Sequence, residues 1–217
     1  MADDDRDQLD KTFDLKSGAT DSGAVSEYYD DWAESYDETL KSWNYTAPMD
    51  AADLIAGHLR PGDRVLDVGC GTGLFSIAMR MAGDFRIHGI DISEASLKLA
   101  EENGAYERLV AVDLQDVPLP IGDNSMDAAA SVGVLTYIED SAALLRDLCR
   151  IVKSGGVITF TQRTDRWDEL GFGKTLEALE REGLWTILEI TDPKDYLPGN
   201  PDFGDDIRVI HTLCRVS

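Results

Sequence analysis

Apolar residues recur along most of the chain in two forms, as short continuous runs and as longer stretches with helical spacing. The runs predict buried strands, and the helical stretches predict amphipathic helices. Strands are expected at 64–68, 86–91, 109–113, 126–132, 156–161, 184–190 and 206–215, and helices at 73–82, 94–102, 140–151 and 172–182. The central alternation of strands and helices is typical of an α/β fold with a mostly parallel sheet covered on both faces.

The N-terminal part follows a different pattern. Residues 1–23 are polar and acidic and predict a flexible arm, so that a single domain spans 24–217. Large apolar side chains then fall at helical spacing, namely Val25, Tyr28, Tyr29, Trp32, Tyr36 and Leu40. Thr46 is expected to cap a second helix with Pro48 in its first turn, and the helical region ends by residue 60. The aromatic helix predicts either ordinary core packing or the wall of a pocket.

A glycine-rich turn follows the first expected strand, with Gly69, Gly71 and Gly73. Such a turn lets the backbone approach a ligand, and the helix start beyond it adds unpaired N–H groups. Asp91 ends the next strand, 18 positions after Gly73, where an acidic residue can accept hydrogen bonds from ribose hydroxyls. The dinucleotide fingerprint would need a glycine at position 74, which is Leu74. The pattern therefore favours a nucleoside or an anionic ligand group and disfavours NAD.

Composition narrows the function classes. The chain has 217 residues with 42 acidic and 20 basic side chains, a net charge of −22. This charge opposes binding to nucleic acid and to anionic membranes, and it also suits a salty environment. The sequence contains no apolar run of about 18 residues, so no membrane-spanning helix is expected. The acidic N-terminus does not resemble a secretory signal. The three cysteines show no metal-ligand spacing, so free thiols and a cytoplasmic location are expected.

The segment Val65-Leu-Asp-Val-Gly-Cys-Gly-Thr-Gly73 resembles the first motif of class I S-adenosylmethionine-dependent methyltransferases. Asp91 matches the acidic residue that ends the family's second strand, and 112–114 and 153–156 match later positions. The resemblance implies a Rossmann-like, seven-stranded, mostly parallel sheet with an antiparallel last strand and an N-terminal helical lid over 24–60. Residues 29–33 and 161–163 are similar to the narrower Williams–Beuren syndrome region methyltransferase-like branch.

The resemblance also implies roles for single residues. The expected cofactor-binding residues are Asp67, Gly69, Gly71, Gly73, Asp91, Ile92, Asp113, Leu114, Ser131, Trp32 and Tyr36. Of these, Asp67 is expected to receive the ammonium group of the cofactor, Asp91 the ribose hydroxyls and Asp113 the adenine amino group. The expected acceptor pocket consists of Tyr28, Tyr29, Gly133 and Tyr137. Tyr137 is also the one catalytic candidate, through a hydroxyl that orients the acceptor, with a tyrosine bonded only to backbone as the alternative.

The expected function is methyl transfer from S-adenosylmethionine to a small-molecule acceptor, leaving S-adenosylhomocysteine. No metal, nucleic acid or membrane partner is expected, and the oligomeric state is open. His58, His88 and His211 fall in expected helices and strands and are interpreted as structural. Two alternatives remain: a cofactor-binding protein without turnover, and a methyltransferase acting on protein or nucleic acid.

Overall fold

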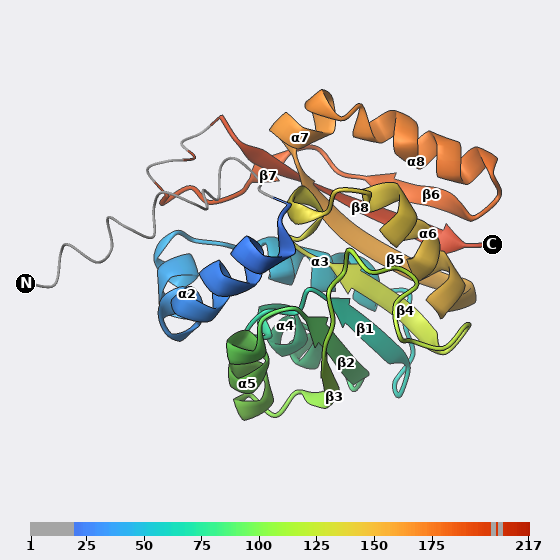
Figure 1. Cartoon of the computed structure of the whole chain (residues 1–217). Coiled ribbons are helices and arrows are strands. Elements are labelled where there is room, and N and C mark those ends of the chain that lie inside the picture. The colour runs from blue at the N-terminus through green and yellow to red at the C-terminus, as the bar shows by residue number, and fades with distance from the viewer. Residues whose placement is uncertain (1–19, 201–202, 204–205) are drawn as a thin grey trace, which may run out of the picture.

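A single mixed sheet forms the centre of the molecule in the computed structural model, which describes residues 20–200, 203 and 206–217 (Figure 1). Most of the expected arm, 1–19, lies outside these residues. The strands are β1 (Arg64–Val68), β2 (Arg86–Asp91), β3 (Tyr106–Ala111), β4 (Met126–Ser131), β5 (Val152–Arg163), β6 (Trp185–Ile190), β7 (Lys194–Asp195) and β8 (Arg208–Val216).

The strand order is β3-β2-β1-β4-β5-β8-β6, with the two-residue β7 paired to β8. The neighbours from β3 to β5 are parallel, whereas β8 runs antiparallel to both β5 and β6. This confirms the expected mostly parallel sheet with an antiparallel last strand. In a parallel sheet the carboxyl ends of the strands meet at one edge, which is where ligands bind in open α/β folds.

Helices cover both faces of the sheet, as expected (Figure 1). They are α2 (Ser22–Ser42), α3 (Ala47–Ala56), α4 (Leu74–Ala82), α5 (Glu94–Glu102), α6 (Ser141–Ile151), α7 (Thr164–Glu169) and α8 (Phe172–Arg181), with the 3-10 turn η1 (Leu135–Tyr137). Successive residues of β1 enter different cores, because side chains alternate along a strand. Val65 packs with α3 and α4, and Leu66 packs with α6 and α8.

The structure differs from the sequence-based expectations at several places. Thr46 does precede α3, but its hydroxyl donates to Asp50 Oδ2 at 2.9 Å and makes no capping hydrogen bond. β3 begins at Tyr106, three residues before the expected strand. The sequence pattern missed this start because Glu107 and Arg108, both exposed on this edge strand, interrupt the apolar run. The short helix α7 was not predicted, since no residue within it is buried.

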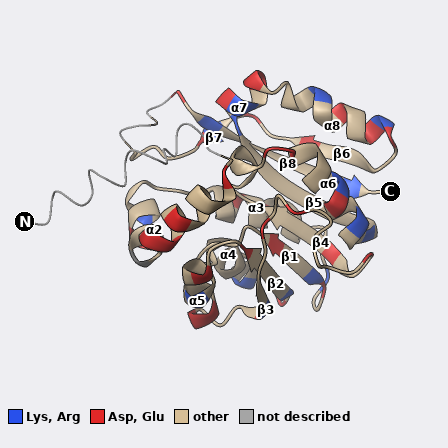
Figure 2. Ribbon diagram, in the orientation of Figure 1, with Lys and Arg blue, Asp and Glu red and all other residues tan. Residues whose placement is uncertain are grey.

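The aromatic helix α2 lies apart from the sheet and close to α5 (Figure 1). It begins at Ser22, where the Asp21 side chain accepts a hydrogen bond from the Ala24 N–H and caps the helix. Asp and Glu are distributed over α2, α5 and α8 (Figure 2). Across the described part of the chain, no helix combines the length and apolar character needed to cross a membrane.

Candidate active site

The glycine turn between β1 and α4 has a backbone that other residues rarely adopt. Gly69, Gly71 and Gly73 have φ values of 71°, 51° and 96°, in the left-handed region that favours glycine. A Cβ on Gly69 would lie 2.4 Å from Val134 Cγ2. A Cβ on Gly71 would meet no atom within 4 Å. Gly69 is therefore required for packing, and Gly71 faces open space.

Asp91, at the carboxyl end of β2, holds this turn. Its Oδ2 accepts the Gly71 N–H at 2.7 Å, and its Oδ1 accepts the Ser93 N–H at 2.9 Å. Burial raises the pKa of Asp91, and the N–H groups of Ser93 and Gly71 oppose that shift. Each carboxylate oxygen can accept more than one hydrogen bond, so Asp91 can still receive hydroxyl groups from a ligand.

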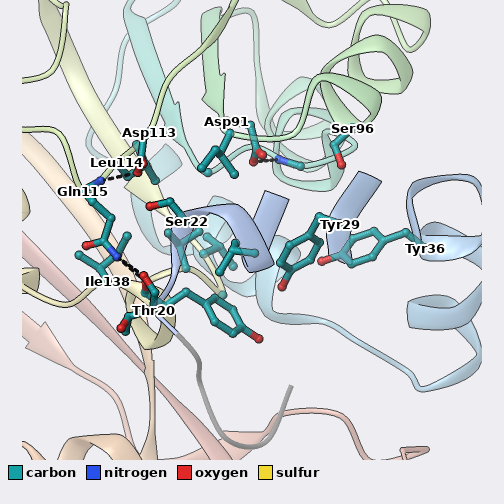
Figure 3. A pocket seen from close by; sticks show the side chains of 18 residues that line it. Thr20, Ser22, Tyr29, Tyr36, Asp91, Ser96, Asp113, Leu114, Gln115 and Ile138 are labelled. Atoms are coloured by element: carbon teal, nitrogen blue, oxygen red, sulfur yellow. Dashed lines mark hydrogen bonds between the residues drawn. The ribbon is translucent and has the colours of Figure 1, made fainter. Parts of the chain in front are cut away.

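A cavity lies above the turn at the carboxyl edge of the sheet (Figure 3). Asp91, Ser96 and Asp113 lie on its sheet side, and Tyr29 and Tyr36 reach it from α2. Its lining consists of Thr20, Ser22, Val25, Tyr29, Tyr36, Gly69, Gly71, Asp91, Ile92, Ser96, Asp113, Leu114, Gln115, Val132, Gly133, Val134, Tyr137 and Ile138. This combination of carboxylates at one end and aromatic rings at the other suits a ligand with a polar sugar and an apolar portion.

A second, smaller cavity adjoins the first across the glycine turn. Gly69, Gly71, Tyr36 and Val132 line both spaces. The second space is further lined by Asp67, at the end of β1, together with Tyr45, Pro48, Cys70, Thr72, Leu74 and Phe75. The two spaces therefore divide a ligand site into a part with Asp91 and Asp113 and a part with Asp67.

Hydrogen bonds attach the α2 region to the body of the site. Ser93 Oγ and Thr72 Oγ1 donate to Asp30 and Asp37 of α2, each at 2.5 Å. The Gln115 side chain donates to the Thr20 carbonyl at 2.8 Å (Figure 3). These three partners sit beside Asp91, the glycine turn and Asp113, so α2 is fastened to the segments that line the cavity.

Tyrosine hydroxyls meet at the end of the cavity beyond the glycine turn. Tyr29 is hydrogen-bonded to Tyr137, and Tyr45 to Tyr196. A Cβ on Gly133 would lie 2.9 Å from the Tyr45 hydroxyl. Burial raises the pKa of all four phenols, so they remain protonated at neutral pH and can donate hydrogen bonds.

Four of the expected site residues lie away from the cavity lining. The Tyr28 and Trp32 rings pack edge-on against each other at 5.6 Å, and Trp32 continues to Trp43. Ser131 is fully buried. A Cβ on Gly73 would lie 2.3 Å from the Asn103 side chain, so this glycine serves packing between the turn and α5. The other expected residues all line one of the two spaces.

The histidines also lie outside both spaces. His58 pairs with Arg215, His88 with Glu107, and His211 with the Ala47 carbonyl. Among the described residues, no group of three or more His, Cys, Asp or Glu side chains gathers as a metal site.

Several lining residues were missed in the sequence. Gln115 follows Asp113 by two positions and could have been noted as a polar residue after a strand. Tyr45 and Thr20 carry no motif, because only the folded chain brings Tyr45 to the smaller space and Thr20 to the larger one.

Comparison with known proteins agrees with this geometry. Residues 66–160 match the methyltransferase domain family. Methyltransferase-like protein 27 of Homo sapiens is 34% identical over 179 residues, which cover 79% of this chain and 72% of the relative. Malonyl-[acyl-carrier protein] O-methyltransferase of Serratia marcescens is 37% identical over 105 residues, covering 48% of this chain and only 40% of that relative. The crystal structure of the [4+2]-cyclase SpnF has the same fold, with a TM-score of 0.71 at 21% identity over 91% of this chain and 97% of that one.

The fold, the glycine turn and these matches define an S-adenosylmethionine-dependent methyltransferase. The chain belongs to the class I S-adenosylmethionine-dependent methyltransferase family, and the match to methyltransferase-like protein 27 confirms the expected narrower branch.

Proposed function

We propose that the enzyme transfers the methyl group of S-adenosylmethionine to a small-molecule acceptor enclosed beneath α2. The observation that carries the proposal is the placement of Tyr29 and Tyr36 over the cavity whose opposite wall holds Asp91 and the glycine turn. A site closed by a helix in this way suits an acceptor small enough to be surrounded. The three free, buried cysteines suit the reducing cytoplasm, which is the proposed compartment.

The lining residues fit the cofactor. Asp91 would accept hydrogen bonds from both ribose hydroxyls, and Asp113 would accept from the adenine amino group, with Ile92 and Leu114 against the ring. Asp67, in the adjoining space, would receive the ammonium group. The bound cofactor supplies a sulfonium whose methyl group is already a strong electrophile.

The chain's own contribution would then be placement and exclusion of water. Tyr29, Tyr36 and Tyr137 would surround the acceptor, and holding it in line with the methyl group can contribute as much as about 7–11 kcal/mol in favourable intramolecular models. Since burial raises the pKa of Tyr137, its hydroxyl would orient the acceptor as a donor and would not remove a proton.

Replacing Tyr137 with phenylalanine is expected to slow methyl transfer about tenfold, the loss of one hydrogen bond of roughly 1.4 kcal/mol, while S-adenosylhomocysteine binding stays unchanged. The measurement is the initial rate at which methyl label from the donor enters the small-molecule fraction of a cell extract. Tyr28→Phe is the matched control, because Tyr28 lies outside the cavity lining. An equal loss in both variants would contradict a role for the Tyr137 hydroxyl.

The same labelling experiment separates the candidate functions. Label in small molecules supports the proposal. Label in protein or RNA would replace it with a macromolecular methyltransferase. Tight cofactor binding without any transfer, across extracts of different origin, would favour a binding protein without turnover.

We also propose that α2 is a lid. Asp37→Ala removes the hydrogen bond from Thr72 and is expected to speed S-adenosylhomocysteine release about fivefold to tenfold, as the loss of one hydrogen bond of about 1–1.4 kcal/mol would. Stopped-flow dissociation measures this rate. Glu38→Ala, an exposed neighbour on the same helix, is the control. Lower thermal stability with an unchanged release rate would show that α2 only packs.

A further inference from the structure

Tyr106 reaches under the site from the edge of the sheet. It is the first residue of β3, and its hydroxyl donates to Asp67 Oδ2 on β1 at 2.6 Å. The strand β2 lies between β3 and β1. A side chain on β3 therefore has to cross an intervening strand to reach this carboxylate.

Gly89 is the residue of β2 that allows the crossing. It pairs with Asp67 on one side and with Leu109 on the other. A Cβ on Gly89 would lie 2.8 Å from Tyr106 Cε1 and 2.8 Å from Cys70 Sγ. Because a Cβ cannot approach other atoms so closely, only glycine leaves room for the phenol ring beneath the glycine turn.

Asp67 is 2% exposed and lines the smaller of the two adjoining spaces. Among the residues that the structure describes, the Tyr106 hydroxyl provides the one hydrogen bond to the Asp67 carboxylate. Buried carboxylates need hydrogen-bond partners, and a phenol that engages one oxygen restricts how the carboxylate can turn.

We infer that Tyr106 is a positioning residue, which fixes the Asp67 carboxylate for the ammonium group in the amino-acid portion of the cofactor. The inference rests on the proposed cofactor site and adds to it a residue that touches neither the adenosine nor the methyl group.

The contact between Tyr106 and Asp67 is expected to make ligand affinity depend on pH. Burial raises the pKa of Asp67, the hydrogen bond from Tyr106 lowers it, and the nearby charge of Asp91 raises it, which together place this pKa at about 7. The other titratable groups around the same space are Cys70, Tyr36 and Tyr45, which burial keeps neutral because it raises the pKa of each. An ammonium group binds the ionised carboxylate, so affinity is highest at a pH well above 7 and falls as the pH drops through the pKa of Asp67. Loss of the phenol hydroxyl raises that pKa and moves the fall to higher pH.

Two ligands separate this effect from general damage to the site. S-adenosylhomocysteine contains the ammonium group, whereas 5′-methylthioadenosine contains the same nucleoside without the amino-acid portion. Calorimetry at pH 6, 7 and 8 on Tyr106→Phe is expected to show about tenfold weaker binding of S-adenosylhomocysteine at pH 7. The pH at which the affinity for S-adenosylhomocysteine is half of its maximum should be higher for Tyr106→Phe than for the unmodified enzyme. Binding of 5′-methylthioadenosine should stay within about twofold of the unmodified enzyme at all three values.

A second variant disturbs the contact between Tyr106 and Asp67 by filling the space that the Tyr106 ring crosses. Gly89→Ala should displace the Tyr106 ring and reproduce the selective loss for S-adenosylhomocysteine. Asp91→Ala should weaken both ligands, because the ribose is common to them. Equal weakening of both ligands by Tyr106→Phe, or an unchanged pH midpoint, would overturn the inference. If the unmodified enzyme bound neither ligand, the proposed function itself would fail.

Discussion

Replacing Asp91 with alanine is expected to weaken S-adenosylhomocysteine binding by about 3 kcal/mol, roughly 150-fold. The variant removes the acceptors proposed for the ribose hydroxyls. It also frees the Gly71 and Ser93 N–H groups that the carboxylate holds at 2.7 and 2.9 Å, so the turn itself becomes less ordered. Isothermal calorimetry at pH 8 measures the loss.

Two control variants show whether the loss of binding comes from the Asp91 carboxylate. Asp91→Asn keeps one carbonyl oxygen for one of the two N–H groups and should fall between the unmodified enzyme and the alanine variant. Glu102→Ala removes an exposed carboxylate at the end of α5 and should bind normally. Binding within twofold of normal in Asp91→Ala would show that Asp91 does not contact the ribose.

Gly71→Val is expected to abolish detectable cofactor binding while the protein still folds. A Cβ at this position meets no protein atom within 4 Å, and Gly71 lines both parts of the site, so the added side chain occupies ligand space. The cost to folding is limited to the left-handed backbone, about 1–3 kcal/mol. Calorimetry and thermal unfolding together separate the two effects.

Gly171→Val is the matched control for that backbone cost. Gly171 has φ of 58°, close to the 51° of Gly71, and also has open space around its Cβ position, but it lies outside both parts of the site. It should lose similar stability and bind the cofactor normally. Equal binding by the two variants would place the ligand away from the glycine turn.

The sequence predicted the centre of this site because the relevant signals are local. Strand, glycine turn and helix follow one another over 64–82, and Asp91 and Asp113 close expected strands. Side chains that arrive from elsewhere were not predictable. Tyr106 reaches Asp67 across 39 positions of sequence and only through the gap left by Gly89.

Helical periodicity also left the orientation of α2 open. Tyr28 and Tyr29 are adjacent in sequence, yet only Tyr29 lines the cavity. Neighbouring helical residues point about 100° apart, and the wide aromatic stripe is compatible with either one facing inward. The tertiary contacts of Asp30 and Asp37 with Ser93 and Thr72 determine the rotation, and neither pair carries a recognisable motif.

The most direct measurement is a crystal structure of the enzyme with S-adenosylhomocysteine bound. The ribose is predicted to lie on Asp91, the adenine between Ile92 and Leu114 with its amino group on Asp113, and the ammonium group on Asp67, all beneath α2. A nucleoside bound outside this cavity, or bound within it with Asp91 and Asp67 more than hydrogen-bonding distance away, would contradict the account.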